Sequence, residues 1–157
     1  MLPSDRGLLI PMRWLRQWGP ALLWAAAMWL FSTQFFTTAS TSRYLIPLLK
    51  WLFPSASPAT LLLVHALIRK LAHVAEYVVL SLLVLRGVRG ERRGWRLTWA
   101  LAALAIALSY AALDEVHQLF VPGRGGSARD VLLDGCGAAL GQLLAKWFSP
   151  REEKEEK

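Results

Sequence analysis

Hydrophobic residues along this chain gather in four long, largely apolar stretches separated by polar segments. The stretches cover residues 20–36, 61–85, 97–120 and 131–148. A helix rises about 1.5 Å per residue, so each stretch is long enough to cross a hydrocarbon layer about 30 Å thick. We therefore predict an all-α, polytopic membrane protein with four transmembrane helices.

The polar segment between the first two stretches contains a further amphipathic pattern. Residues 44–53 alternate aromatic and aliphatic side chains around one lysine, Lys50. Such a pattern is typical of a short helix that lies in the membrane interface. No internal repeat divides the chain, so we expect one transmembrane domain over residues 1–150. Residues 151–157 form a charge-rich tail, which we expect to be cytoplasmic and disordered.

Composition agrees with a membrane domain and argues against an ordinary soluble one. The chain is 55% hydrophobic and only 18% charged, and its formal net charge is +7. In a soluble protein this charge would suggest a nucleic-acid partner, but here most basic residues flank the apolar stretches, so no such partner is expected. Cys136 is the only cysteine, which excludes an intrachain disulfide and a CxxC motif.

The distribution of Lys and Arg predicts the orientation. Three basic residues precede the first stretch, five lie between the second and third, and four end the chain, so twelve of the 18 fall on one side of a four-span topology. By the positive-inside rule that side is the cytoplasm. We expect a multi-pass protein with both termini in the cytoplasm and the connection between the third and fourth stretches outside.

The second stretch presents one polar face although it is otherwise apolar. At about 100° per residue, most of its ionisable side chains fall within a narrow sector of a helix. They are His65, Arg69, His73 and Glu76, with Lys70 and Tyr77 at the margin. Taken alone, His65 is expected to be an ordinary interfacial polar residue. Charge within a bilayer is costly, so a clustered ionisable face indicates a functional site.

The third and fourth stretches carry polar faces at the same predicted depth. In the third, one sector holds four polar side chains and leaves Glu115 to one side. The four are Tyr110, Asp114, His117 and Gln118. In the fourth, Asp130 and Asp134 lie one turn apart, and two glycines continue their line, where small residues allow another helix to approach. We expect the three faces to converge on a polar cavity in the outer half of the bilayer.

Two spacings on these faces suit acid–base chemistry or a divalent metal. They are His73-x-x-Glu76 and Asp114-x-x-His117, each of which sets a carboxylate and an imidazole on one helical face. The neighbouring Arg and Lys side chains would repel a cation, so we expect no metal and no cofactor. The chain has no established catalytic motif, which leaves catalysis open. The candidate catalytic residues are His73, Glu76, Asp114, Glu115 and His117.

Basic and amide side chains on the same faces favour a ligand with an anionic group. Arg binds phosphate or carboxylate through its planar fork, and a lipid headgroup presents such a group at the depth of this cluster. The candidate ligand-binding residues are Arg69, Lys70, Tyr77, Gln118, Arg124, Asp130 and Asp134. The alternative is structural, because interhelical polar contacts also hold membrane helices together.

Two motifs of the chain resemble those of the VanZ-like family of small bacterial membrane proteins. The first reads Arg69-Lys70-x-x-His73-x-x-Glu76-Tyr77-x-x-Leu80, and the second reads Asp114-Glu115-x-His117-Gln118-x-Phe120-x-Pro122-Gly123-Arg124, followed by Asp130. Two shorter segments add to the resemblance, namely Asp134-x-x-Gly137-x-x-x-Gly141 and Ser32-Thr33-Gln34. Asp134 stands where the family usually has Asn, which adds a titratable group.

The resemblance implies a four-helix protein of the bacterial cytoplasmic membrane and a role in susceptibility to teicoplanin-type glycopeptide antibiotics. The partners expected are membrane lipids or a lipid-linked envelope precursor, bound by the polar site. A membrane-embedded hydrolase or transferase and a purely structural or partner-binding protein remain as alternatives. The sequence also leaves open whether the protein is an oligomer.

Overall fold

The described part of the chain folds entirely into α-helices. The computed structural model describes residues 6–33, 38–121 and 125–149. Its five helices are α1 (Arg6–Phe31), α2 (Thr38–Leu52), α3 (Pro58–Arg89), α4 (Leu97–Gln118) and α5 (Ala128–Trp147). The all-α class is therefore confirmed. Residues 34–36 of the first predicted span and the tail at 151–157 lie outside the described residues.

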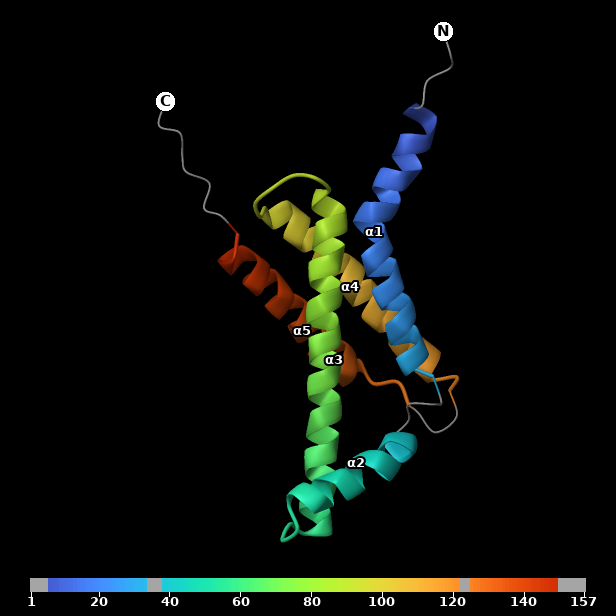
Figure 1. The fold of residues 1–157 in the computed structure, drawn as a ribbon, viewed down its shortest axis with the longest axis vertical. Helices are drawn as coiled ribbons and strands as arrows, with labels where there is room; N and C mark the ends of the chain where they lie inside the picture. Colours follow the sequence, from blue (N-terminus) through green and yellow to red (C-terminus); the bar gives the residue numbers. More distant parts are fainter. Residues whose placement is uncertain (1–5, 34–37, 122–124, 150–157) are drawn as a thin grey trace.

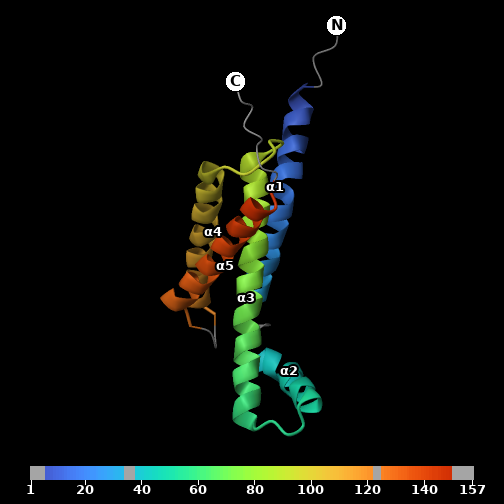
Figure 2. The same ribbon diagram turned by 90° about the vertical axis from the view of Figure 1, so that its left-hand side faces the viewer.

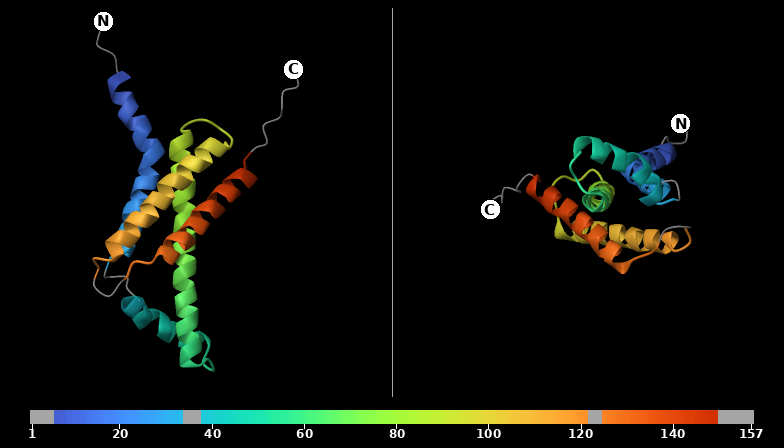
Figure 3. Two further views of the ribbon diagram at one scale, coloured as in Figure 1. Left: turned by 180° about the vertical axis from the view of Figure 1, so that it is seen from behind. Right: turned by 90° about the horizontal axis from the view of Figure 1, so that it is seen from below.

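Helix α3 is the centre of the molecule, because it contacts each of the other four helices. Figure 1 shows α1 and α4 beside its upper part, α5 crossing it obliquely, and α2 beside its lower part. In Figure 2, α4 and α5 lie on one side of α3 and α1 and α2 on the other. The right-hand view of Figure 3 is seen from below, along α3, and again shows α4 and α5 on one side of α3 and α1 and α2 on the other. Any site on the polar face of α3 is therefore walled by the surrounding helices.

Two of the helices have the length and composition of membrane spans. Among the described residues, α3 and α4 are long and apolar enough to cross a bilayer. Helix α3 has 32 residues and is therefore about 48 Å long, more than the hydrocarbon layer requires. Its start is fixed by Ser57, whose side chain accepts a hydrogen bond from Thr60 N at 3.1 Å, and Gly90 ends it with a φ of 62°.

The first helix begins earlier than the apolar stretch predicts. Helix α1 starts at Arg6 rather than at residue 20 and continues through Pro11 and Pro20. The ring of Trp18 in this helix lies against Gly87 of α3. A Cβ atom at position 87 would lie 2.7 Å from that ring. Position 87 therefore requires glycine for α1 to approach α3.

The predicted amphipathic helix is present as α2. It begins at Thr38, six residues earlier than the pattern of residues 44–53 suggests, and ends at Leu52. Tyr44 and Trp51 project away from the protein, with 76% and 75% of their surfaces exposed. Lys50 Nζ donates to the carbonyl oxygen of Pro54 at 2.8 Å and so ties the end of α2 to the following turn.

Side-chain hydrogen bonds fasten α1 to its neighbours. Tyr110 of α4 donates through its hydroxyl to the carbonyl oxygen of Ala25 at 2.6 Å. Trp24 Nε1 donates to the carbonyl oxygen of Glu76 in α3 at 3.0 Å. These bonds place the lower end of α1 beside the polar faces of α3 and α4.

Loss of the Tyr110 hydroxyl should weaken the packing of α1 against α4. We expect Tyr110→Phe to lower the free energy of unfolding by about 1 kcal/mol, because it leaves a carbonyl oxygen without its donor. Tyr44→Phe serves as the matched control, because the Tyr44 side chain is exposed. Thermal unfolding of both purified variants in detergent measures the difference. An equal melting temperature for the two would contradict a stabilising role of this bond.

Two glycines and one glutamine bring α5 against α3. A Cβ atom at Gly137 would lie 2.5 Å from Val74 O, and one at Gly141 would lie 2.8 Å from Val78 O. Gln142 Nε2 then donates to Ser81 Oγ at 2.7 Å and to Ser81 O at 3.1 Å. The glycines predicted to allow a close helix contact therefore make that contact with α3.

Candidate functional site

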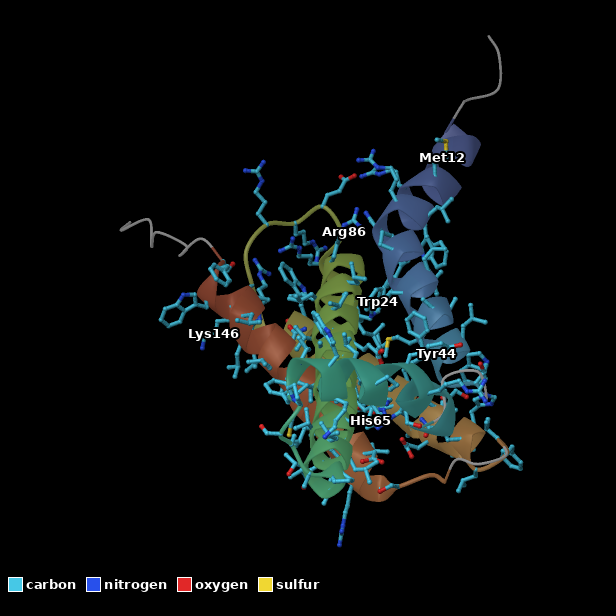
Figure 4. The ribbon with its side chains drawn as sticks, turned by 60° about the horizontal axis from the view of Figure 1, so that its bottom comes forward. Met12, Trp24, Tyr44, His65, Arg86 and Lys146 are labelled. Carbon is cyan, nitrogen blue, oxygen red and sulfur yellow. The ribbon has the colours of Figure 1, made fainter. Side chains whose placement is uncertain are left out.

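The polar face of α3 meets α2 at its N-terminal end. Arg69 Nη1 donates to Thr41 Oγ1 at 3.0 Å, and His65 Nε2 lies 3.2 Å from the same oxygen. His65 is only 2% exposed, because α2 covers this part of the α3 face. Its expected position at the membrane interface stays a prediction, since burial within the protein does not test it. Figure 4 shows His65 near α2, with Arg86 toward the opposite end of α3.

The two predicted imidazole–carboxylate pairs have different geometries. His73 Nδ1 lies 3.8 Å from Glu76 Oε2 on α3. On α4, Asp114 instead accepts a hydrogen bond from Gln118 Nε2 at 2.9 Å. The ring of His117 stacks on Trp29 of α1, with 4.1 Å between ring centroids. His73 therefore has a carboxylate in reach, whereas His117 has an aromatic neighbour.

Glu115 belongs to the interior of the site, although helical spacing sets it to one side of the face of Asp114 and His117. It is only 7% exposed, and its Oε2 accepts a hydrogen bond from Ser127 N at 2.6 Å. Ser127 is the N-cap of α5, and its side chain accepts from Arg129 N. A carboxylate beside a helix N-terminus is electrostatically favourable. Glu115 thus fixes the start of α5 against the end of α4.

A polar cavity opens between α3, α4 and α5. Its volume is about 310 Å³. Cationic side chains of α3 form one wall, and acidic and amide side chains of α4 and α5 form the other. The lining residues are Ala66, Arg69, Lys70, His73, Glu115, Gln118, Gly125, Asp130, Leu133 and Asp134. Seven of the candidate residues from three helices therefore share one space.

A second, mostly apolar cavity adjoins the first. Its volume is about 330 Å³, and both cavities include Arg69 and His73 in their linings. Helices α1, α2, α3 and α4 contribute its walls. The lining residues are Met28, Phe31, Ser32, Thr41, Leu45, Ile68, Arg69, Ala72, His73, Glu76, Tyr77 and Asp114. Each volume falls at the lower end of the range for small-molecule sites, which is about 300–1,000 Å³.

Four deeply buried oxygens beside these cavities have no hydrogen-bond partner within residues 6–33, 38–121 and 125–149. They are Ser32 Oγ, Tyr77 Oη, Asp114 Oδ1 and Asp134 Oδ1. Their residues are 3%, 1%, 6% and 2% exposed, respectively. Buried polar groups in folded proteins nearly always have a partner, supplied by protein, water or ligand. Their position at the cavity walls indicates that bound molecules provide it.

The predicted site residues fall into three groups. Arg69, Lys70, His73, Glu115, Gln118, Asp130 and Asp134 line the polar cavity. Glu76, Tyr77 and Asp114 line the apolar cavity. His117 is in neither lining, and Arg124 lies outside the described residues, as do Pro122, Gly123 and Gln34.

The apolar cavity contains residues that sequence reasoning did not place in the site. Thr41 and Leu45 come from α2, Met28 comes from α1, and Ser32 directly follows the last residue of α1. Ser32 belongs to a polar triplet that was visible in the sequence, but nothing in its spacing linked it to α3. Thr41 gives no local signal, because its role depends on the docking of α2.

The carboxylates and imidazoles do not converge in the way that metal ligands do. Across the described ranges, no group of three or more His, Cys, Asp or Glu side chains is placed to hold a metal ion. Cationic Arg69 and Lys70 share the polar cavity with the carboxylates, which makes the space suited to a ligand with charged groups of its own.

Comparison with known proteins gives one family assignment. No curated protein and no solved structure matches the chain. A family model described as VanZ/LLP1 matches residues 7–149, which include all five helices almost completely. The long apolar helices α3 and α4 agree with a membrane location for such a protein. The matched region covers both cavities and nearly the whole chain, and the protein belongs to the VanZ/LLP1 family.

Proposed function

We propose that this protein binds an anionic lipid or a lipid-linked envelope precursor in the outer half of the bacterial cytoplasmic membrane. The observation that carries the proposal is the pair of adjoining cavities, one charged and one mostly apolar, which share Arg69 and His73. An amphiphile has both characters in one molecule. Its headgroup suits the polar cavity, and its hydrocarbon chain suits the apolar one.

In this proposal α1, α3, α4 and α5 cross the membrane, and both termini are cytoplasmic. The start of α1, the end of α5 and the α3–α4 connection lie toward one end of the molecule in Figure 1, away from α2. Arg13, Arg16, Arg86 and Glu91 meet at that end around a small cavity. Clustered basic residues favour the cytoplasmic side. The two large cavities then lie toward the outer face.

Helix α2 supports the proposed depth of the site. An amphipathic helix with exposed Tyr44 and Trp51 suits the membrane interface, where aromatic side chains are favourable. Thr41 of this helix accepts a hydrogen bond from Arg69. Arg69 would then sit close to the level of lipid phosphates, where a guanidinium group forms charge-assisted hydrogen bonds. Occupancy by an envelope precursor would alter what a teicoplanin-type glycopeptide reaches.

Replacement of Arg69 tests the binding function. We expect Arg69→Gln to retain about tenfold less phospholipid or lipid-linked precursor than the wild type, because it removes a charge-assisted hydrogen bond. The readout is mass spectrometry of lipids that copurify with the full-length protein in mild detergent. Arg43→Gln is the control, since Arg43 is an exposed arginine of α2 that lines neither cavity.

The same pair of variants links binding to antibiotic susceptibility. The wild type and Arg43→Gln should raise the teicoplanin concentration that inhibits a susceptible host, and Arg69→Gln should not. Equal lipid retention by the wild type and both variants would overturn the binding proposal. Retention that depends on Arg69 without any change in susceptibility would confine the function to lipid binding.

A second candidate function is a membrane-embedded hydrolase or transferase. The observation that favours it is His73, which borders both cavities and lies 3.8 Å from the Glu76 carboxylate. An imidazole oriented by a carboxylate can act as a general base, and Arg69 would stabilise a developing negative charge. The purified protein incubated with envelope lipids decides between the two. A new lipid product that is absent with His73→Gln would favour the enzyme.

A further inference from the structure

The polar cavity carries opposite charges on its facing walls. Arg69 and Lys70 come from α3, whereas Asp130 and Asp134 come from α5. A ligand with only a negative group would be attracted by the first wall and repelled by the second. A ligand with only a positive group would meet the reverse problem. The arrangement therefore suits a ligand that carries both charges.

The acidic wall offers a buried acceptor to a hydrogen-bond donor. Asp134 is 2% exposed, lines the polar cavity, and its Oδ1 has no partner among the described residues. A primary ammonium group has three N–H donors and no acceptor, and an ionised carboxylate accepts only. A quaternary ammonium group has the same charge but no N–H donor. The chemistry of Asp134 therefore favours a primary amine.

The shared residues determine where the phosphate and the chain lie. Arg69 borders both cavities, so a phosphate held by its guanidinium group would sit at their junction. On one side of this junction lies the acidic wall of the polar cavity, with Asp130 and Asp134. On the other side, Met28, Leu45 and Ile68 line a space suited to a hydrocarbon chain.

We propose, on the basis of the lipid-binding function above but with a zwitterionic rather than a net anionic headgroup, that the ligand is a phosphoethanolamine-type amphiphile. Its phosphate binds at Arg69 and Lys70, its primary ammonium group donates to Asp134 beside Asp130, and one hydrocarbon chain occupies the apolar cavity. Specificity then comes from the acidic wall, whereas affinity for any phospholipid comes from Arg69.

A headgroup series tests this proposal on the delipidated full-length protein in detergent. The probes are lysophosphatidylethanolamine, lysophosphatidylcholine and lysophosphatidylglycerol with identical chains, and the readout is the dissociation constant from native mass spectrometry. We expect the ethanolamine lipid to bind about tenfold more tightly than either of the others, because only it supplies an N–H donor with a positive charge.

Variants of the two carboxylates test which residues produce the preference for the ethanolamine headgroup. Asp134→Asn and Asp130→Asn should each reduce the preference for the ethanolamine lipid, while binding of the glycerol lipid stays equal or becomes tighter. Glu91→Gln, at the opposite end of the molecule, is the control and should keep the full preference. Arg69→Gln should weaken all three lipids.

The outcomes separate this inference from the function on which it rests. Glycerol lipid binding as tight as ethanolamine lipid binding would overturn the inference and leave the lipid-binding function in place. Choline lipid binding as tight as ethanolamine lipid binding would overturn it as well, because charge alone would then suffice. Absence of binding by all three would overturn both proposals. These comparisons need only the wild type, so they hold even where a variant fails to fold.

Discussion

Replacement of Gly137 by leucine is expected to separate α5 from α3 and to destroy the site. A Cβ atom at this position would lie 2.5 Å from Val74 O and 3.2 Å from Tyr77 Cβ. The nearest atom is helix backbone, which cannot rotate away as the end of a side chain can. Relief of the clash requires the two helices to move apart, and with them the walls that carry His73 and Asp134.

The expected cost is large because the substitution overfills a close helix contact. We expect Gly137→Leu to lower the free energy of unfolding by about 3 kcal/mol, at the upper end of the usual cost of overpacking. Cys136→Leu is the matched control, since Cys136 is the adjacent residue of α5 and is exposed. Fluorescence-detected size exclusion and thermal unfolding in detergent measure both variants. Equal stability of Gly137→Leu and Cys136→Leu would contradict the contact between α3 and α5.

The glycine contact illustrates what the sequence determines and what it leaves open. The line from Asp134 through Gly137 to Gly141 predicted a face for close approach by another helix. In the structure this face of α5 does lie close to another helix, and that helix is α3. Spacing along one helix defines which residues share a face. It contains no information on which other helix covers that face.

The same distinction explains Glu115 and His65. Helical spacing correctly separates Glu115 from the face of Asp114 and His117, but the start of α5 covers the side on which Glu115 lies. His65 has the spacing of a polar interfacial residue, and α2 buries it through Thr41. In both cases the burial arises from tertiary contacts between segments far apart in the chain, which helical spacing does not contain.

The boundaries of α1 and α2 were less predictable than those of the central helices. The apolar stretches at 61–85 and 97–120 predicted bounds close to those of α3 and α4, because the composition of these helices is strongly apolar. Helix α1 continues through Pro20, a residue that normally indicates a helix start or break. The apolar cavity depends on these two helices, so it could not be predicted from the polar faces alone.

Asp134 is expected to act against the stability of the fold. The carboxylate is 2% exposed, and its Oδ1 has no hydrogen-bond partner among residues 6–33, 38–121 and 125–149. Burial of a polar group without compensation is unfavourable, whereas an apolar side chain of similar size is favourable in the same place. We expect Asp134→Leu to raise the free energy of unfolding by about 1–3 kcal/mol and to abolish the preference for an amine headgroup.

Gln142→Leu provides the opposite case on the same helix. Gln142 is also buried, at 4% exposed, and its Oε1 likewise has no partner among the described residues, but its Nε2 donates two hydrogen bonds to Ser81. Its replacement removes both bonds and leaves Ser81 O without that donor, so stability should fall by about 1–3 kcal/mol. Thermal unfolding of the ligand-free proteins measures the two changes side by side. A loss of stability in both variants would make Asp134 a structural residue, whereas a gain for Asp134→Leu together with lost binding would mean that the buried carboxylate is retained for the ligand.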